Sequence, residues 1–246
     1  VILTSAAIQA VTGAFPAQRV YYIRASTQVF SATTADGVAL VEEPGVRLSS
    51  LTVPSLPIAV SSITGLSILP LNAGGFRMAY SVIGTTGSFR IHTATSADGL
   101  AWANDTGTAV NVGSTTFAGY PSLVKLASGD WAMFYTQSTV AASSDPAHFQ
   151  IFAAFSSNEG LNWSTAGVVV AARAGQVSAT KLTNNLVRLY YTAPLTGGTT
   201  NTLVLSALSV NTNGSSFSLE SGIRLSTSPG TIISPFVTRT TDTFRW

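Results

Sequence analysis

The chain has 246 residues, of which only 9% are charged, and its formal net charge is +2. An average globular chain is roughly 25% charged. This low charge, with no basic run, gives no indication of nucleic-acid binding. No apolar stretch approaches the roughly 18 residues of a membrane-spanning helix. The absence of Cys excludes disulfides, cysteine-zinc sites and thiol nucleophiles.

Two short markers recur in the same order along the chain. The first is a strand-like segment that ends in Tyr, and it occurs at Gln18–Tyr22, Phe76–Tyr80, Trp131–Tyr135 and Val187–Tyr191. The second is a turn glycine with a large residue three places later, in the pairs Gly37/Leu40, Gly99/Trp102, Gly160/Trp163 and Gly214/Phe217. Because two independent markers recur together, the sequence indicates an internal repeat of roughly 55–60 residues.

The third copy shows the expected elements most clearly. We predict strands over 121–126, 131–136, 149–156 and 161–170, from apolar alternation and β-branched or aromatic content. The connections would be a turn at 127–130, a long loop at 137–148 and a hairpin turn at 158–160. A unit of four antiparallel strands at this period is typical of a propeller blade, with the large residue after the turn packed between blades.

The sequence therefore predicts one all-β domain over 1–246, a β-propeller with repeats near 6–50, 51–115, 116–174 and 175–229 and a partial copy at 230–246. The segment Phe244–Trp246 matches the start of the first marker and begins a fifth copy. We expect five blades, with the closing blade incomplete or shared between the N- and C-termini, where Val1–Ser5 could supply one strand. The alternative is four blades sealed by the tail. Whether the chain is truncated at Trp246 stays open.

Three segments carry a resemblance to known proteins: Ala94–Trp102, Pro121–Thr136 and Phe152–Trp163. They resemble the blade signature of five-bladed glycoside-hydrolase propellers of the arabinanase, invertase and levansucrase type. The resemblance implies two or three carboxylates at a central funnel, because glycoside cleavage uses a pair of acids. It also implies an Asp before the Pro that opens a blade, whereas here Tyr120 precedes Pro121 and Ser234 precedes Pro235.

The ten acidic residues are poorly placed for such a pair. Asp145 alone falls in a long loop, near His148, where the two could form a weak metal or acid–base site or a solvated pair. The other acids are expected in hairpin turns (Asp36, Asp98, Glu159), first turns (Asp130, Asp242) and at the rim after fourth strands (Glu42, Glu43, Asp105, Glu220). We therefore assign no catalytic residue, metal or cofactor. The candidate ligand-binding residues are Tyr120, Ser234, Asp145 and His148.

Three functions remain open at this point. The first is a non-catalytic extracellular or surface propeller that binds glycan or displays an interaction surface. The second is a structural or assembly subunit of a surface layer, sheath or appendage, which would imply homo-assembly. The third is a glycoside hydrolase with unusually placed acids. Abundant Ser, Thr, Gly and Ala with only two Lys is typical of secreted or cell-surface proteins.

Four arginines share one repeat position on the expected second strands: Arg19, Arg77, Arg188 and Arg245. A ring of arginines could bind anionic sugars. Because they recur in register, pairing with neighbouring strands is the alternative that we favour.

Overall fold

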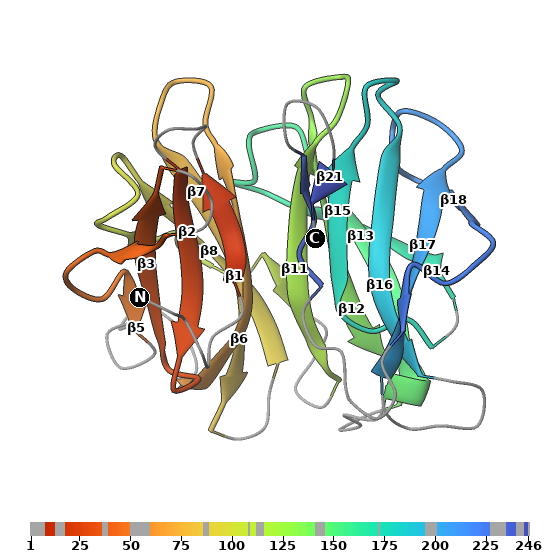
Figure 1. Ribbon diagram of the computed structural model, residues 1–246, viewed down its shortest axis with the longest axis horizontal. Coiled ribbons are helices and arrows are strands. Elements are labelled where there is room, and N and C mark those ends of the chain that lie inside the picture. Colours follow the sequence, from red (N-terminus) through yellow and green to blue (C-terminus); the bar gives the residue numbers. More distant parts are fainter. Residues whose placement is uncertain are drawn as a thin grey trace.

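The computed structural model describes residues 8–12, 18–35, 39–49, 60–85, 89–107, 109–111, 116–140, 146–171, 173–194, 201–226, 235–239 and 244–245. Over these residues the elements are β-strands apart from one short 3-10 helix, η2 (Pro146–His148). The strands form antiparallel sheets arranged as a β-propeller with four blades (Figure 1). Within the described residues, no helix is long and apolar enough to cross a membrane.

The first two blades lie on the left of Figure 1. The first blade has the sheet order β1-β2-β3-β4, with β5 also paired to β3. Its strands are β1 (Ile8–Thr12), β2 (Gln18–Arg24), β3 (Gln28–Thr34), β4 (Val41–Glu42) and β5 (Leu48–Ser49). The second blade has the order β10-β8-β7-β6, with β9 also paired to β8. Its strands are β6 (Val60–Pro70), β7 (Phe76–Gly84), β8 (Phe89–Ser96), β9 (Ala103–Asn104) and β10 (Val110–Asn111).

The third and fourth blades lie on the right of the same view. The third has the order β11-β12-β13-β14, with strands β11 (Ala118–Lys125), β12 (Trp131–Ser138), β13 (Phe149–Ser156) and β14 (Ser164–Val170). The fourth has the order β15-β16-β17-β18, with β19 also paired to β17. Its strands are β15 (Val177–Lys181), β16 (Val187–Pro194), β17 (Asn201–Ser209), β18 (Phe217–Leu219) and β19 (Leu225–Ser226).

A fifth, two-stranded sheet follows the fourth blade. It pairs β20 (Thr238–Arg239) with β21 (Phe244–Arg245). The all-β propeller is confirmed, with four blades formed and a fifth sheet begun. The N-terminal strand that was expected to share the closing blade, Val1–Ser5, lies outside the described residues, so shared closure stays a prediction.

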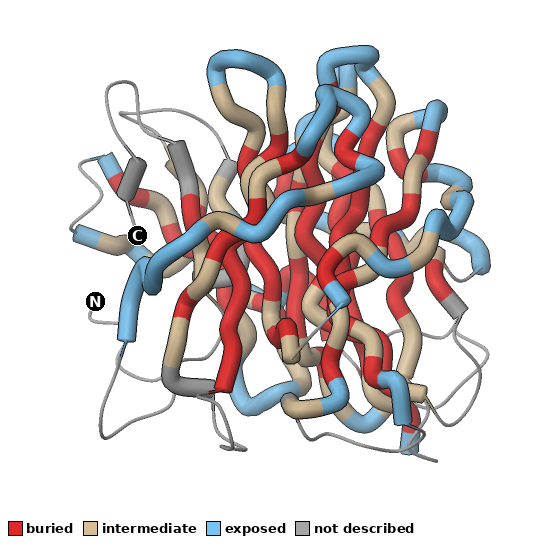
Figure 2. The backbone as a smooth tube through the Cα atoms, turned by 90° about the vertical axis from the view of Figure 1, so that its right-hand side faces the viewer, coloured by how far each residue is buried: buried red, intermediate tan, exposed pale blue. Residues whose placement is uncertain are grey.

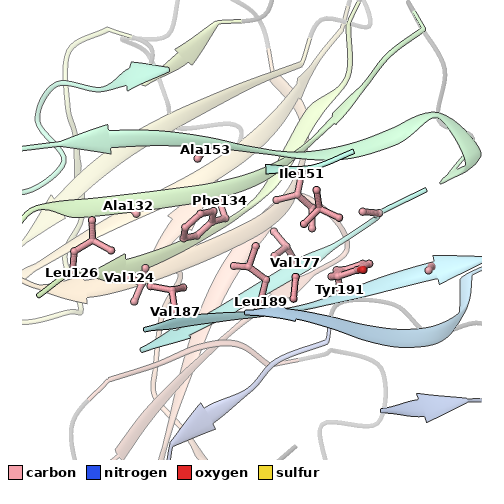
Figure 3. Close-up of a cluster of buried hydrophobic side chains, with 14 residues drawn as sticks. Val124, Leu126, Ala132, Phe134, Ile151, Ala153, Val177, Val187, Leu189 and Tyr191 are labelled. Carbon is pink, nitrogen blue, oxygen red and sulfur yellow. The ribbon is translucent and has the colours of Figure 1, made fainter. Parts of the chain in front are cut away.

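Buried residues run along the middle of the strands, and exposed residues gather at the turns and on the outer strands (Figure 2). The largest apolar cluster joins the third blade to the fourth. It includes Phe134 and Ile151 from the third blade and Leu189 and Tyr191 from the fourth (Figure 3). Burial of such side chains is worth about 1.5–3 kcal/mol each, so the blades stabilise one another across their faces.

The two repeat markers meet at the boundaries between blades. Tyr21 of the first blade donates a hydrogen bond to the carbonyl of Gly99 in the turn of the second (3.0 Å). Trp102, three residues after that turn, packs edge-to-face on Tyr21 with ring centroids 6.1 Å apart. Phe134 and Phe217 repeat this contact between the third and fourth blades at 5.4 Å. The predicted packing of the large residue between blades is therefore confirmed at these two boundaries.

Serine hydroxyls link successive inner strands around the propeller axis. Ser67 of β6 accepts a hydrogen bond from the Leu123 amide of β11 (3.0 Å), and Ser122 accepts one from Ala179 of β15 (2.8 Å). Ser178 in turn accepts from the amide of Val237, just before β20 (3.1 Å). These three serines occupy one repeat position, and they connect the second, third and fourth blades and the start of the fifth sheet.

The predicted strands of the third copy need small corrections. The third strand is confirmed over Phe149–Ser156, but the first begins at Ala118 and the second continues to Ser138. The fourth begins at Ser164 rather than at 161. The reason is that the Asn158 carboxamide oxygen accepts from the Asn162 amide (3.0 Å), which holds 161–163 in the turn instead of the ladder.

Candidate functional site

A small cavity of about 110 Å³ lies on the propeller axis, among the inner strands of the blades. Its walls come from β1, β6, β11 and β15, together with Pro235–Val237 just before β20. Pockets that enclose drug-sized ligands usually measure roughly 300–1,000 Å³. The axial cavity is therefore suited to one small ring or the end of a longer molecule.

Tyr120 lines this cavity in an unusual backbone conformation. Its φ is +54°, in the left-handed region that bulky residues rarely adopt. The pairing of β11 with β12 shifts between Gly119 and Ser122, so Tyr120 and Pro121 form a β-bulge. Bulges commonly occur beside functional sites, where they redirect a side chain. Left-handed geometry at such a residue costs about 1–3 kcal/mol and persists only where its surroundings enforce it.

Neighbouring groups enforce this conformation. The Tyr120 amide donates to the buried hydroxyl of Ser81 (3.2 Å), which also shares a hydrogen bond with Thr64 (2.8 Å). The Tyr120 ring lies 5.6 Å from that of Phe117. Gly65 leaves room for the bulge, because a Cβ at that position would stand 3.0 Å from the Tyr120 Cα. The strained tyrosine is thus supported by both the second and the third blade.

Gln176 also lines the cavity, and the sequence analysis missed it. It stands two residues before Ser178, as Tyr120 stands two residues before Ser122. Both therefore occupy the position at which the resemblance implies an acid. The signal was available as the shared serine register, but the missing proline beside Gln176 concealed it. Together, Tyr120 and Gln176 present a phenol ring and a carboxamide to the same axial space.

The cavity wall carries no carboxylate among its described residues. Three of the ten acids, Asp36, Asp145 and Asp242, lie outside the residues that the structure describes. The remaining seven are turn or rim residues, as expected. In the part of the chain that is described, no three His, Cys, Asp or Glu side chains gather closely enough to hold a metal ion.

The rim acids pair with the in-register arginines. Glu43 binds Arg19 with both carboxylate oxygens (2.7 and 2.9 Å), and Glu220 binds Arg188 (2.9 Å). Burial raises the pKa of the Glu43 carboxyl, but hydrogen bonds from Arg19 and Ser31 outweigh that effect, so the pKa is lowered overall. The favoured structural pairing is therefore confirmed for these arginines. The side chain of Arg245 lies outside the described residues.

The turn acids are explained by backbone hydrogen bonds. Asp98 accepts from the amides of Leu100 (2.8 Å) and Ala101 (3.1 Å), which lower the pKa of its carboxyl. Glu159 instead reaches out of its turn and accepts from the Asn72 amide of the second blade (2.7 Å). Both turn acids thus bind backbone amides, locally for Asp98 and across the boundary between blades for Glu159, whose side chain is longer.

Of the other predicted ligand-binding residues, only His148 is described, and it does not line the cavity. His148 is exposed at the end of η2, and its carbonyl accepts from the amide (2.9 Å) and hydroxyl (3.1 Å) of Thr139. Ser234 and Asp145 lie outside the described residues. In the sequence, Ser234 directly precedes the wall residue Pro235.

Comparison with known proteins bears on the fold alone. No protein-family model and no curated protein sequence matches the chain. Solved structures do match it. A family-43 glycoside hydrolase from Xanthomonas citri in complex with xylose is 13% identical, with 99% of this chain and 81% of that chain covered and a TM-score of 0.73. The shared β-propeller fold confirms the architectural part of the resemblance.

Two further structures show the same fold. A β-xylosidase/α-arabinofuranosidase from a compost microbial metagenome, in complex with xylotriose, is 14% identical over 99% of this chain and 85% of that chain, with a TM-score of 0.72. An arabinanase from Bacillus subtilis is 13% identical over 83% of this chain and 72% of that chain, with a TM-score of 0.60. The chain is therefore a β-propeller whose fold is similar to that of family-43 glycoside hydrolases.

Proposed function

We propose that the chain is a non-catalytic, glycan-binding β-propeller that holds one neutral sugar residue in its axial cavity. The observation that carries this proposal is the pairing of strained Tyr120 with Gln176 at cavity positions that carry no carboxylate. An aromatic face packs on the C–H surface of a sugar, and a carboxamide can both donate to and accept from its hydroxyls. Xylose and xylotriose in two of the similar structures support this ligand class.

The cavity chemistry favours binding over hydrolysis. Glycoside hydrolysis requires one carboxyl group as acid and a second as nucleophile or base, roughly 5–10 Å apart. Tyr120 and Gln176 provide neither. A protein that keeps the sugar-sized cavity without the acid pair would bind a glycan end and release it unchanged. A secreted or cell-surface location suits this role and stays a prediction.

Calorimetry and a glycan array test the proposal. We expect saturable binding of a neutral mono- or oligosaccharide, lost or at least about tenfold weaker in Tyr120→Ala and Gln176→Ala. The matched control is Val41→Thr, exposed on the outer edge of the first blade. Binding that survives both cavity substitutions, or no binding to any sugar on the array, would contradict the proposal.

A hydrolysis assay separates binding from catalysis. Wild-type protein incubated with xylotriose and with arabinan oligosaccharides should release no product, as measured by anion-exchange chromatography. Product formation would instead support the glycoside-hydrolase alternative. In that case, Asp36, Asp145 and Asp242 become the first acids to substitute, because their places lie outside the described residues.

An assembly role is the second candidate, and one surface favours it. The outer edge of the fourth blade exposes Leu219 (68%), Ile223 (55%) and Leu225 (51%) within seven residues. An apolar sheet edge of this kind can pair with another chain. Light scattering should then show association that Leu225→Lys abolishes, and a monomer at every concentration would exclude this role.

A further inference from the structure

The boundary between the third and fourth blades lacks an arginine that the two preceding boundaries have. Arg19 of the first blade donates from Nη1 to the Asp98 carbonyl in the turn of the second (2.7 Å). Arg77 of the second blade donates in the same way to the Glu159 carbonyl in the turn of the third. The equivalent residue of the third blade is Ala132, which stands three residues before Tyr135 as Arg77 stands before Tyr80.

A groove of about 490 Å³ lies at this boundary. Three turns surround it: residues 126–130 and 156–164 of the third blade, and 213–215 of the fourth. Phe155, which pairs with Ala132 across β12 and β13, is partly buried and forms part of the wall. Tyr120 lies near the start of β11, whereas the groove lies beyond the other end of that strand, so the groove is separate from the axial cavity.

Acceptors at the groove lack the hydrogen-bond donors that their equivalents have at the other two boundaries. Asn213 is the register equivalent of Asp98 and Glu159, but within the described residues no arginine reaches its carbonyl. Phe134 replaces Tyr21, so the hydroxyl that binds the Gly99 carbonyl has no counterpart at Gly214. Where the structure is described, Asp130 forms no ion pair.

Three of the five serine hydroxyls that line the groove are already used as donors. Ser128 donates to the Asp130 carboxylate (2.8 Å) and Ser215 donates to the Asn213 carboxamide oxygen (2.7 Å). Ser156 is paired with Asn158 (2.9 Å). Beside the hydroxyls of Ser157 and Ser164, the groove offers a carboxylate, backbone carbonyls and an aromatic ring. A ligand that is rich in donors and positively charged complements this set better than a neutral sugar does.

We propose that this groove receives an arginine side chain from a partner polypeptide. A planar guanidinium can donate to the Asn213 carbonyl and the Asp130 carboxylate together, while its face packs on Phe155. The chain already uses this combination in the first blade, where Arg24 lies 4.4 Å over the Phe30 ring and pairs with Glu42 (2.9 Å). The partner's arginine would thus donate the hydrogen bond to a turn carbonyl that Arg19 and Arg77 donate at the two preceding boundaries.

The test uses three short peptides: acetyl-Gly-Arg-Gly-amide, the same peptide with citrulline, and the same peptide with lysine. Titration of the full chain by calorimetry and NMR should show saturable binding of the arginine peptide. Citrulline has the same shape without the charge, and we expect it to bind at least about tenfold more weakly. The lysine peptide should also bind more weakly, because its ammonium lacks the planar fork.

Two variants locate the binding site. Asp130→Asn should weaken the arginine peptide by at least about fivefold without affecting sugar binding in the axial cavity. Ala132→Arg should place an internal arginine at this boundary and abolish peptide binding. If Ala132→Arg fails to fold, Asp130→Asn alone decides the matter.

Several results would overturn the proposal. They are the absence of saturable binding, equal affinity for the arginine and citrulline peptides, and affinity unchanged in Asp130→Asn. Displacement of the arginine peptide by xylotriose would show that the groove takes sugar, and it would also contradict the proposal. None of these outcomes bears on the axial cavity, which Tyr120→Ala tests separately.

Discussion

Replacement of Gly99 by alanine should reveal how strongly the repeat markers join the first two blades. Gly99 has a φ of +76°. A Cβ added there would stand 2.5 Å from the Tyr21 hydroxyl and 2.7 Å from Arg19 Nη1. Both neighbours belong to β2 and donate to the turn that contains Gly99. The methyl group would therefore push apart the two segments that meet at this boundary.

Three contributions set the loss in free energy of unfolding that Gly99→Ala should cause. Left-handed backbone geometry costs an alanine about 1–2 kcal/mol. Overpacking a well-filled boundary typically costs about 1–3 kcal/mol. Weakening the hydrogen bonds from Tyr21 and Arg19 adds about 0.5–1.5 kcal/mol each. Because these effects overlap in one displacement, we expect Gly99→Ala to reduce the free energy of unfolding by about 3–5 kcal/mol.

Gly222→Ala provides a matched control. Its φ is +87°, but a Cβ there would meet nothing within 4 Å. The control therefore measures the backbone cost alone, about 1–2 kcal/mol. Urea unfolding followed by the fluorescence of the four tryptophans gives both values. Equal destabilisation by the two substitutions would refute the reasoning, because the boundary contacts would then contribute nothing.

Three further predictions test other parts of the fold. Burial lowers the pKa of His92 from 6.5 to about 4, so the unfolded chain takes up the proton at a higher pH than the folded chain does. The free energy of unfolding should therefore fall by about 3 kcal/mol as the pH drops from above 6.5 to 4. Urea unfolding across this range should show the fall, and His92→Gln should abolish this pH dependence. Ser122→Ala should cost about 1–2 kcal/mol and speed hydrogen exchange of the fourth-blade amide that it binds, and unchanged exchange would contradict the serine link. Arg77→Met leaves the half-buried carboxylate of Asp105 without its ion pair and should lower the free energy of unfolding by about 3–5 kcal/mol, as measured by thermal unfolding. Arg24→Met removes an exposed ion pair and should cause no measurable change.

The strands themselves could be predicted well because their signals are local. Apolar alternation over Phe149–Ser156 predicted β13 at its observed bounds. The start of β14 was missed because it depends on a hydrogen bond between Asn158 and Asn162, which competes with the strand ladder. Local patterns thus identify a strand, while turn hydrogen bonds set where it ends.

The candidate site could be predicted only in part. Tyr120 was found because the proline after it marks the start of an inner strand, but Gln176 has no such mark. The cavity joins residues from four inner strands that lie roughly 55 positions apart in the sequence. No local pattern specifies which of them face the same space, so the shared serine register became informative only in the folded chain.

The sequence by itself determined the all-β class, the repeat and the low charge, because strand periodicity, turn glycines and composition are properties of short segments. It also showed that tyrosine and serine stand before Pro121 and Pro235. Only the tertiary structure decided that Arg19 pairs with Glu43, that serines link the inner strands, and that a groove remains beside Phe155. The physical reason is that these contacts join segments that are distant in the sequence, within one blade for Arg19 and Glu43 and between blades for the serines and the groove. Such contacts exist only after the strands have packed.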